Sequence, residues 1–451
     1  MAIQNTNLSA SEIHNLFTEA RQLFFIGIGG VSMSSLATYC RYIGKDVYGY
    51  DSKRTNITKK LEHLCKITYK STPDNVEGMD LVVYTGAIDE DNFEYKQAKK
   101  KHIPLISRAN FLGYVVSNYK KRIGVCGMHG KSTTTAMLEC IFTKAHRHPT
   151  VFCGAEMKST GSCSIIDKKD VCIFEACEYL DSFLCQSPTD AGILNIDSEH
   201  LDYFNSVEDI VKSFQKFANY AQSVYINVDD KLSQGINHNN IITYGIQNNA
   251  DYMAKILSPS SYIVIYKGTE IARCYLSQSG THYIYDSLCA FSIAHNFGIA
   301  PSIISSALFE YRGLKRRMDF LGKTDTGVDI FEDYAHHPSE IKCTLDSAID
   351  NGKKKILCVF QPHTYSRTVS LYDEFCKSLR VASSLIILPT FSAREENIYG
   401  LDEEKFARDC GGTLIKDRSE VVDKIKSTDC DLVLLMGAGD LCGIKQLLFK
   451  E

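Results

Sequence analysis

The sequence predicts an α/β fold of three domains built on largely parallel sheets. Apolar, β-branched stretches of strand length alternate with helical stretches along the chain, and this alternation is typical of strand–helix–strand units. A length of 451 residues allows two or three domains. Hydrophobic residues make up 44% and charged residues 23% of the chain, as in ordinary globular proteins, which excludes a fibrous or disordered chain.

The alternation falls into three blocks, for which we expect domains at 1–118, 119–312 and 313–451. The first block has expected strands at 22–28, 46–51 and 80–87, a helix at 34–42, and a polar candidate linker at 117–121. The second has strands at 122–127, 171–174 and 191–195, with a helix at 133–142. The third has strands at 328–333, 355–362, 384–390 and 431–439.

Composition narrows the classes of partner. The formal net charge is -4, from 50 basic and 54 acidic residues, so no strong field favours nucleic acid or a membrane surface. The N-terminus lacks the pattern of a secretory signal, and no apolar run approaches the roughly 18 residues of a spanning helix. The 17 cysteines follow no paired spacing, which favours buried thiols in a reducing compartment. We expect a cytoplasmic protein with no nucleic-acid or membrane partner.

A first glycine-rich turn, GIGGVS at 27–32, joins the first strand to a helix. Glycines let backbone amides approach a pyrophosphate, and a helix N-terminus favours the anion. A strict dinucleotide fingerprint would have glycine in place of Ser32, and Asp51 stands where an acidic residue would meet a ribose. This motif alone leaves open a structural turn, NAD, or another nucleotide diphosphate.

A second glycine-rich turn, GMHGKST at 127–133, follows a strand and opens a helix. A full Walker A loop would need glycine at Val125, so the match is the shorter GxxGK[ST]. The chemistry is the same, because amides surround the phosphates, Lys131 offsets their charge and the Ser132 hydroxyl reaches Mg²⁺. This turn predicts an ATP site.

Acidic, amide and imidazole groups follow the neighbouring strands. Glu175 and Glu178 come after one strand, and Asn195 and His200 after the next. Because ligands bind beyond the carboxyl ends of parallel strands, these groups are expected to converge on the second glycine-rich turn. Glu175 would hold Mg²⁺ and His200 a second metal ion, although a solvated strand end and a capping or core histidine remain the alternatives.

Two motifs stand in the third block, DYAHHP at 333–338 and QPHTYSRT at 361–368. Pro338 is placed to start a helix, and the two histidines lack the neighbouring ligands of a zinc site. The guanidinium of Arg367 suits a carboxylate or phosphate. The basic run at 315–317 fits a solvated face or a nucleotide contact equally well.

Together these segments resemble the Mur ligases over essentially the whole chain, through GIGGVSMS, GMHGKSTTT, FEACEYLDSF, NIDSEHLDYF, LKRRMDF, EDYAHHPSEI, FQPHTYSRT and LLMGAGDL. YAHHP and QPHTYSRT resemble the branch that acts on UDP-N-acetylmuramate. The resemblance implies a Rossmann-like UDP-binding domain, a central P-loop-type ATPase domain and a C-terminal Rossmann-like domain. It implies ATP-dependent ligation of L-alanine to the lactyl carboxylate through an acyl phosphate, in peptidoglycan precursor synthesis, with Mg²⁺ or Mn²⁺ and as a monomer or weak homodimer.

The resemblance also implies the site residues. The expected catalytic groups are Lys131, Arg367 and a general base at His336 or His337, and the expected metal ligands are Ser132, Glu175 and His200. The expected ATP-binding residues are Gly127, Met128, His129, Gly130, Lys131, Ser132, Thr133, His282, Asp286, Arg316, Arg317 and Asp333. The expected UDP-substrate residues are Gly29, Gly30, Val31, Ser32, Asp51, Ser52, Thr85, Gly86, Ala87 and Arg108.

Three positions depart from the family pattern. Ser32 replaces a glycine, Cys177 an aspartate, and Asp286 an asparagine that contributes to adenine recognition. An ionised carboxylate only accepts hydrogen bonds, whereas an amide also donates. The alternatives left open are a ligase that recycles a murein tripeptide, a catalytically impaired binding protein of the same fold, and, from the first turn alone, an NAD-dependent oxidoreductase.

Overall fold

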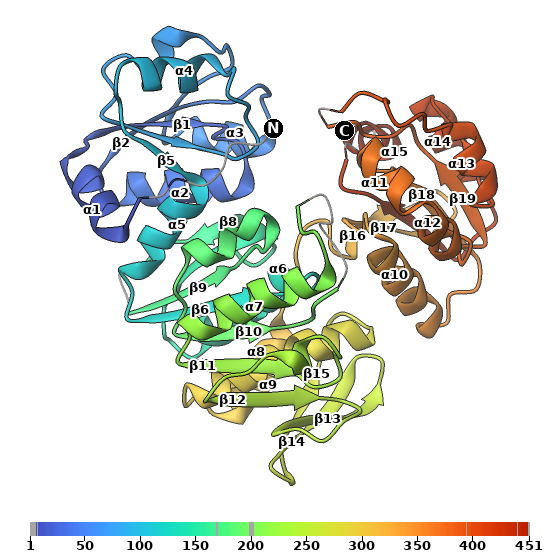
Figure 1. Cartoon of the computed structure of the whole chain (residues 1–451). Coiled ribbons are helices and arrows are strands. Elements are labelled where there is room, and N and C mark those ends of the chain that lie inside the picture. The colour runs from blue at the N-terminus through green and yellow to red at the C-terminus, as the bar shows by residue number, and fades with distance from the viewer. Residues whose placement is uncertain are drawn as a thin grey trace. The chain divides into compact units, whose positions relative to one another are not determined.

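The structure is a computed structural model that describes residue 6 and residues 8–167, 170–197, 203–393, 395–439 and 441–449. It consists of two compact units (Figure 1). The first comprises Met1–Leu257, Ser261–Tyr275 and Ile284–Arg312. The second comprises Ser258–Ser260, Leu276–Tyr283 and Gly313–Glu451, so the segment that carries His282 belongs with the C-terminal part of the chain.

The first unit begins with a five-stranded parallel sheet in the order β3-β2-β1-β4-β5. Its strands are β1 (Gln22–Ile26), β2 (Asp46–Tyr50), β3 (Lys66–Thr68), β4 (Leu81–Tyr84) and β5 (Leu105–Ser107). Its helices are α1 (Ala10–Glu19), α2 (Val31–Tyr42), α3 (Asn56–Leu61), η1 (Pro73–Val76), α4 (Phe93–Lys100) and α5 (Arg108–Ser117). All four residues of β4 are buried, as expected for a parallel strand with both faces covered.

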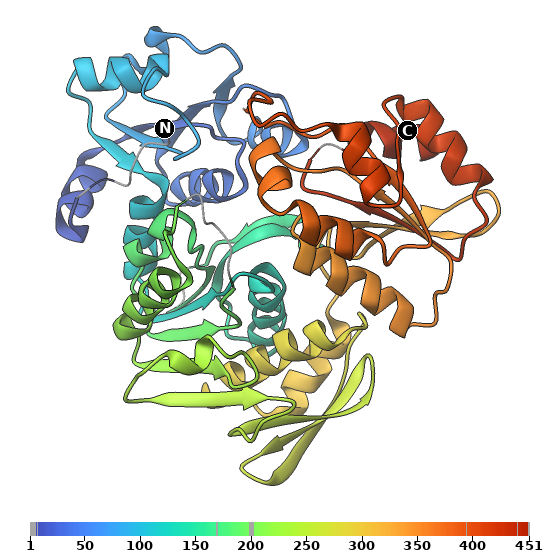
Figure 2. The same ribbon diagram turned by 45° about the vertical axis from the view of Figure 1, so that its right-hand side comes forward.

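A ten-stranded sheet follows, in the order β15-β14-β13-β12-β11-β10-β6-β9-β7-β8 (Figure 2). Its strands are β6 (Lys121–Cys126), β7 (Thr150–Met157), β8 (Ser162–Ile165), β9 (Val171–Glu175), β10 (Asp190–Ile193), β11 (Ser223–Asn227), β12 (Ile241–Gly245), β13 (Tyr252–Ser258), β14 (Ser261–Tyr266) and β15 (Thr269–Tyr275). Its helices are α6 (Lys131–Lys144), η2 (Tyr179–Cys185), α7 (Val207–Tyr220), η3 (Ser233–Gly235), α8 (Thr281–Asn296) and α9 (Pro301–Glu310).

This larger sheet is mixed, not purely parallel. The pairs β7–β8 and β14–β15 are antiparallel, and strand periodicity did not indicate these edge hairpins. The strands β12, β11, β10, β6 and β9 pair in parallel, as the sequence predicted for β6, β9 and β10. The parallel part of the sheet is the part that carries the candidate site.

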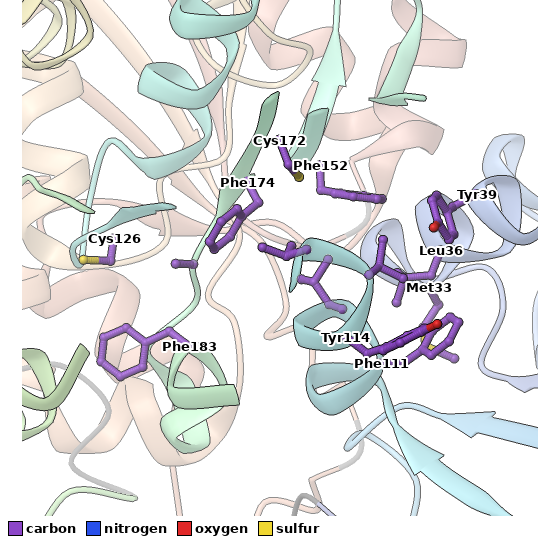
Figure 3. Packing of buried hydrophobic residues seen from close by; sticks show 14 of the residues in the cluster. Met33, Leu36, Tyr39, Phe111, Tyr114, Cys126, Phe152, Cys172, Phe174 and Phe183 are labelled. Carbon is purple, nitrogen blue, oxygen red and sulfur yellow. The ribbon is translucent and has the colours of Figure 1, made fainter. Parts of the chain in front are cut away.

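One hydrophobic cluster joins the two sheets of the first unit. Figure 3 shows side chains of α2 and α5 gathered with side chains of β7 and β9. The ring of Tyr39 on α2 lies edge-on to Phe152 on β7, with 6.4 Å between the ring centroids. Burial of this shared surface holds the two sheets of the unit together.

The second unit has a six-stranded sheet in the order β16-β17-β21-β18-β19-β20. Its strands are β16 (Asp319–Lys323), β17 (Asp329–Asp333), β18 (Ile356–Phe360), β19 (Ser384–Ile387), β20 (Thr413–Leu414) and β21 (Leu432–Met436). Its helices are α10 (Pro338–Asp350), α11 (Tyr365–Ser370), α12 (Tyr372–Leu379), α13 (Glu403–Asp409), α14 (Arg418–Ser427) and α15 (Cys442–Phe449). Only the β16–β17 pair is antiparallel among the described pairs, and α10 begins at Pro338 as predicted.

No helix in the described part of the chain is long and apolar enough to cross a membrane. The observed architecture confirms the predicted α/β class with sheets rich in parallel pairs. The loops that follow β1, β6, β9, β10, β17 and β18 carry the residues considered next, because functional loops gather beyond the carboxyl ends of parallel strands.

Candidate functional site

The second glycine-rich turn is a tight connection between β6 and α6. Gly127 has φ +142° and Gly130 has φ +84°, and both values lie where side chains are strained. Gly130 is the N-cap residue of α6. A Cβ at Gly130 would lie 2.2 Å from Oδ1 of Asp286, so this position requires glycine for space as well as for backbone conformation.

We therefore expect Gly130→Ala to destabilise the first unit and to weaken nucleotide binding. Gly268→Ala is a matched control, because Gly268 also has φ +84° but has nothing within 4 Å of its would-be Cβ. Backbone strain costs about 1–2 kcal/mol in both variants, and only Gly130→Ala has to displace Asp286. Chemical unfolding and ATP titration of both variants measure the difference, and equal losses would contradict the contact.

Lys131 lies folded back over its own turn. Its Nζ donates to the carbonyl of Gly127 at 2.5 Å, to that of Met128 at 3.0 Å, and to Oε1 of Glu178 at 3.1 Å. The side chain of Glu178 is only 1% exposed and that of Lys131 13%. The lysine charge is thus held at the turn by a buried carboxylate, and such a pair is costly to break from one side.

The side chains of Ser132 and Glu175 are hydrogen-bonded to each other at the start of α6. The Ser132 hydroxyl donates to Oε2 of Glu175 at 2.6 Å, and the backbone amide of Gly154 donates to the same oxygen at 2.8 Å. A Cβ at Gly154 would lie 2.4 Å from that oxygen. One hydroxyl and one carboxylate suit Mg²⁺, which takes few protein ligands and completes its shell with water and phosphate oxygens.

Within the described ranges, no three His, Cys, Asp or Glu side chains are grouped as in a metal site held entirely by the protein. His200, which was predicted to hold a second metal ion, lies outside the described residues.

Asn195 holds the turn in place from β10. Its Oδ1 accepts from the amide of His129 at 2.8 Å, and its Nδ2 donates to the carbonyl of His129 at 3.1 Å. Its own carbonyl accepts from the amide of Met128 at 3.2 Å. The sequence placed Asn195 at a strand end, and the structure shows that it holds the backbone of the second glycine-rich turn. Thr133 follows in the first turn of α6.

The first glycine-rich turn joins β1 to α2, with Gly27 at φ +80°. The amide of Gly29 donates to Oδ2 of Asp51 at 2.8 Å, so Asp51 closes the turn from the end of β2. Arg108 at the start of α5 donates from Nη1 to the Ser32 hydroxyl at 3.3 Å. Ser32, which stands where the family pattern has glycine, therefore holds the Arg108 guanidinium beside the N-terminus of α2. The guanidinium and the helix N-terminus both favour an anion at this position.

The other predicted substrate residues flank these contacts. Thr85 packs against Gly27. A Cβ added to Gly27 would lie only 2.6 Å from Cγ2 of Thr85. Its hydroxyl accepts from the amide of Ala87 at 3.4 Å. The remaining members belong to the same turns: Gly30 is the N-cap of α2, Val31 its first residue, and Ser52 and Gly86 follow β2 and β4.

In the second unit, Asp333 ends β17 and is 5% exposed. Its oxygens accept from the amides of Met318 at 2.7 Å and Ala335 at 2.8 Å. Burial raises the pKa of this carboxyl, and the Arg317 guanidinium opposes that rise. Asp333, the predicted ribose acceptor, is therefore hydrogen-bonded to the backbone of Met318, which directly follows the basic run at 315–317.

The two arginines of the basic run lie over one aromatic ring. The guanidinium carbons of Arg316 and Arg317 lie 4.8 and 5.3 Å from the ring centre of Tyr334. Arg316 pairs with Glu332 at 3.1 Å and donates to the carbonyl of Gly437 at 2.8 Å. Nη1 of Arg317 lies 3.5 Å from Oε1 of Glu340. Arg316 is thus engaged within the unit, and Arg317 is the better candidate for a nucleotide contact.

The two adjacent histidines have different roles. Nδ1 of His337 accepts from the amide of Ser339 at 3.4 Å and caps α10. Nδ1 of His336 lies 3.0 Å from the carbonyl of Tyr334 and 3.1 Å from Oε2 of Glu340. Since carbonyls and carboxylates only accept, the His336 proton is assigned to Nδ1, which leaves Nε2 as the acceptor of that ring.

His363 is a candidate that sequence reasoning passed over. It stands four residues before Arg367, which is the only signal of it in the sequence. Its ring stacks on Phe391 at 5.6 Å and lies 6.0 Å from that of His336, measured between ring centroids. Nδ1 of His363 and Nη1 of Arg367 are buried without a hydrogen-bond partner among the described residues, and buried polar atoms of this kind call for an explanation.

Burial, with the nearby His336 and Arg367, lowers the pKa of His363 from 6.5 to about 4. The folded value lies below the unfolded one, so its contribution to stability is complete above about pH 6.5 and is lost as pH falls toward 4. Between pH 7 and 5 we expect a loss of about 1–2 kcal/mol. Urea unfolding at both pH values should show a smaller loss in His363→Gln, and equal losses would contradict the assignment.

A glycine-rich turn at a helix N-terminus, a lysine paired with a buried carboxylate, and a serine hydrogen-bonded to a glutamate at the next strand end are typical of a nucleotide-binding α/β enzyme. Three protein-family models match successive segments of the chain. "Mur ligase family, catalytic domain" matches residues 22–120, "Mur ligase middle domain" matches 125–294, and "Mur ligase, glutamate ligase domain" matches 316–439. The chain belongs to the Mur ligase family.

Relatives that align with nearly the whole chain support membership of this family. A UDP-N-acetylmuramate–L-alanine ligase of Caldanaerobacter subterraneus subsp. tengcongensis is 37% identical, with 96% of this chain and 98% of the relative covered. One from Aquifex aeolicus is 36% identical over the same shares. The crystal structure of UDP-N-acetylmuramate-alanine ligase MurC from Thermotoga maritima has a TM-score of 0.83 at 25% identity, with 95% of this chain and 98% of that chain covered. A murein peptide ligase of Psychrobacter arcticus, at 22% identity, TM-score 0.76 and 95% and 98% coverage, supports the fold alone.

Proposed function

We propose that this protein ligates L-alanine to the lactyl carboxylate of UDP-N-acetylmuramate, with ATP converted to ADP and phosphate, in peptidoglycan precursor synthesis. The observation that carries the proposal is the grouping of Lys131, Ser132 and Glu175 at the ends of β6 and β9. The relatives of that name, aligned over nearly the whole chain, support the choice of substrates.

The first step activates the carboxylate. A lactyl carboxylate oxygen attacks the γ-phosphorus of ATP, the bond to the β-phosphate oxygen breaks, and an acyl phosphate and ADP form. Lys131 supplies positive charge to the phosphates, a mainly electrostatic contribution. Ser132 and Glu175 would hold Mg²⁺, which neutralises phosphate charge when bound. To reach ATP, Lys131 has to exchange part of its contact with Gly127 and Met128.

The second step forms the amide. The alanine amine attacks the acyl carbonyl, and phosphate leaves from the tetrahedral intermediate. Arg367, whose Nη1 is buried without a partner among the described residues, binds the alanine carboxylate. The amine must first lose a proton, and we assign the base to His336, because Nδ1 of His337 is used to cap α10.

The UDP part is assigned to the first glycine-rich turn. The pyrophosphate would lie at the N-terminus of α2, with Arg108 beside it and held by Ser32. Asp286 lies against Gly130, so adenine recognition here would use a carboxylate at this position. We propose a cytoplasmic enzyme that acts as a monomer or weak homodimer on small-molecule substrates, with ATP and Mg²⁺ or Mn²⁺.

The test is ADP and phosphate release with ATP, Mg²⁺ and UDP-N-acetylmuramate, with and without L-alanine, and with product identified by mass. Turnover that requires both substrates and yields the amide supports the proposal. Turnover with L-Ala-γ-D-Glu-diaminopimelate in place of alanine would make it a recycling ligase. A folded protein that binds the UDP-sugar but turns over neither substrate would be a binding protein of this fold.

A further inference from the structure

Two cysteines of the second unit lie in contact outside the proposed ligase machinery. The sulfur of Cys376 on α12 is 3.2 Å from the sulfur of Cys410, 34 residues later in the chain. Cys410 is the C-cap residue of α13. Both are thiols and are not joined in a disulfide. A separation of this size brings the sulfurs within about 1.2 Å of the roughly 2.0 Å length of a disulfide bond.

Cys376 borders a cavity whose lining does not include Cys410. The cavity has a volume of about 420 Å³ and is lined by Tyr372, Asp373, Cys376, Lys377, Arg380 and Asp409. Cys376 is 7% exposed, whereas Cys410 is completely buried. A small solute that enters the cavity therefore reaches the sulfur of Cys376 first, with Cys410 behind it.

The charged surroundings give the two thiols different acidities. Burial raises the pKa of both, and the contact with Cys376 raises that of Cys410 further, while the same contact lowers that of Cys376. The Arg380 guanidinium favours both thiolates, and the Asp409 carboxylate opposes both. Burial therefore favours the thiol form of both residues, and the nearby guanidinium offsets part of that effect.

We propose that Cys376 and Cys410 are a peroxide-sensitive dithiol that closes to a reversible disulfide. The Cys376 thiolate attacks a hydroperoxide, the O–O bond breaks, and a sulfenic acid forms with release of water or an alcohol. The Cys410 thiolate then attacks that sulfur, the S–O bond breaks, and the hydroxide leaves as water. Two thiols are oxidised, one peroxide is reduced, and a small thiol reverses the change.

The disulfide would join two helices and enclose the chain between them. That chain includes β19 and Glu395, which accepts from the amide of Ser366 at 2.9 Å, next to Arg367. A cross-link of this kind removes conformational freedom from the unfolded chain. Oxidation is therefore expected to stabilise the second unit without a change in its fold.

The test uses the full-length, fully reduced protein. It is treated with hydrogen peroxide at pH 7 and 8.5, quenched with N-ethylmaleimide, and mapped by mass spectrometry of non-reduced peptides. We expect a Cys376–Cys410 linked peptide that forms faster at pH 8.5, disappears with dithiothreitol, and raises the unfolding midpoint by about 5 °C or more. Absence of that peptide, while exposed Cys442 is oxidised, would overturn the proposal.

The variants assign the order of reaction. Cys410→Ser should leave a sulfenic acid at Cys376 that dimedone traps, whereas Cys376→Ser should leave Cys410 unoxidised. Cys358, completely buried in β18, is an internal control that should stay reduced throughout. Oxidation of Cys410 in Cys376→Ser, or equal oxidation of Cys358, would contradict a cavity-gated pair. The wild-type peptide map decides the proposal even where a variant does not fold.

Discussion

Replacement of Lys131 by alanine is expected to lower ATP-dependent ADP release by about 10³-fold or more, because it removes the positive charge from the transferring phosphate. The loss should appear in kcat as well as in the apparent affinity for ATP, since the charge acts on the phosphates throughout the transfer. Steady-state ADP release with both other substrates at saturation measures it. Activity near that of the wild type would remove Lys131 from the mechanism.

Lys131→Ala is also expected to lower the stability of the protein, and this effect has to be separated from the loss of catalysis. Lys131→Ala leaves the carboxylate of Glu178, 1% exposed, without its cation, which destabilises by about 3–5 kcal/mol. Lys131→Met with Glu178→Gln removes both charges and should recover much of the stability but not the activity. Lys144→Ala, in the last turn of the same helix and paired with Glu310 at 2.7 Å, is the matched control and should retain activity.

Arg367→Ala is expected to raise the KM for L-alanine by about 10–100-fold, because a charge-assisted bond to a carboxylate contributes about 1.5–3 kcal/mol. The KM for ATP and the affinity for the UDP-sugar should change little, since Arg367 is not assigned to either of those ligands. Initial rates at varied alanine concentration measure the change.

Two further variants make the assignment of Arg367 specific. Arg367→Lys keeps the charge but loses the two-pronged guanidinium, so it should recover only part of the alanine affinity. Arg380→Ala removes another arginine of the second unit, one that donates from Nε to the carbonyl of Asp409 at 3.0 Å, and should leave alanine kinetics unchanged. Unchanged alanine kinetics in Arg367→Ala would place the carboxylate elsewhere.

The sequence predicted those parts of the fold and site that depend on neighbouring residues. The strands at β1, β6, β9, β17, β18 and β21, and the helices that follow the glycine-rich turns, are visible because strand periodicity and glycine conformational needs act over a few residues. Pro338 marked the start of α10 for the same reason. The expected convergence of Glu175 and Glu178 on the second turn rested on the rule that the carboxyl ends of parallel strands lie at one edge of a sheet.

Contacts between distant segments were not predictable in this way. The edge hairpins β7–β8 and β14–β15 depend on which strand each one meets, and Gly154 is required only because Glu175 lies beside it. His363 became a candidate through its neighbours Phe391 and His336, which no local pattern specifies. The shifted pKa of His363 and the buried Nη1 of Arg367, which has no hydrogen-bond partner among the described residues, likewise arise only when the chain has folded.

By itself, the amino-acid sequence determined the α/β class and the two glycine-rich turns, because these follow from local backbone preferences and from motifs a few residues long. Most of the candidate site residues were predicted from short motifs together with the resemblance to the Mur ligases. Only the tertiary structure decided which groups touch: Glu178 on Lys131, Asn195 on His129, Arg108 on Ser32, and Cys376 on Cys410. Those contacts join residues far apart in the chain, and their energies depend on burial and distance, which exist only in the folded protein.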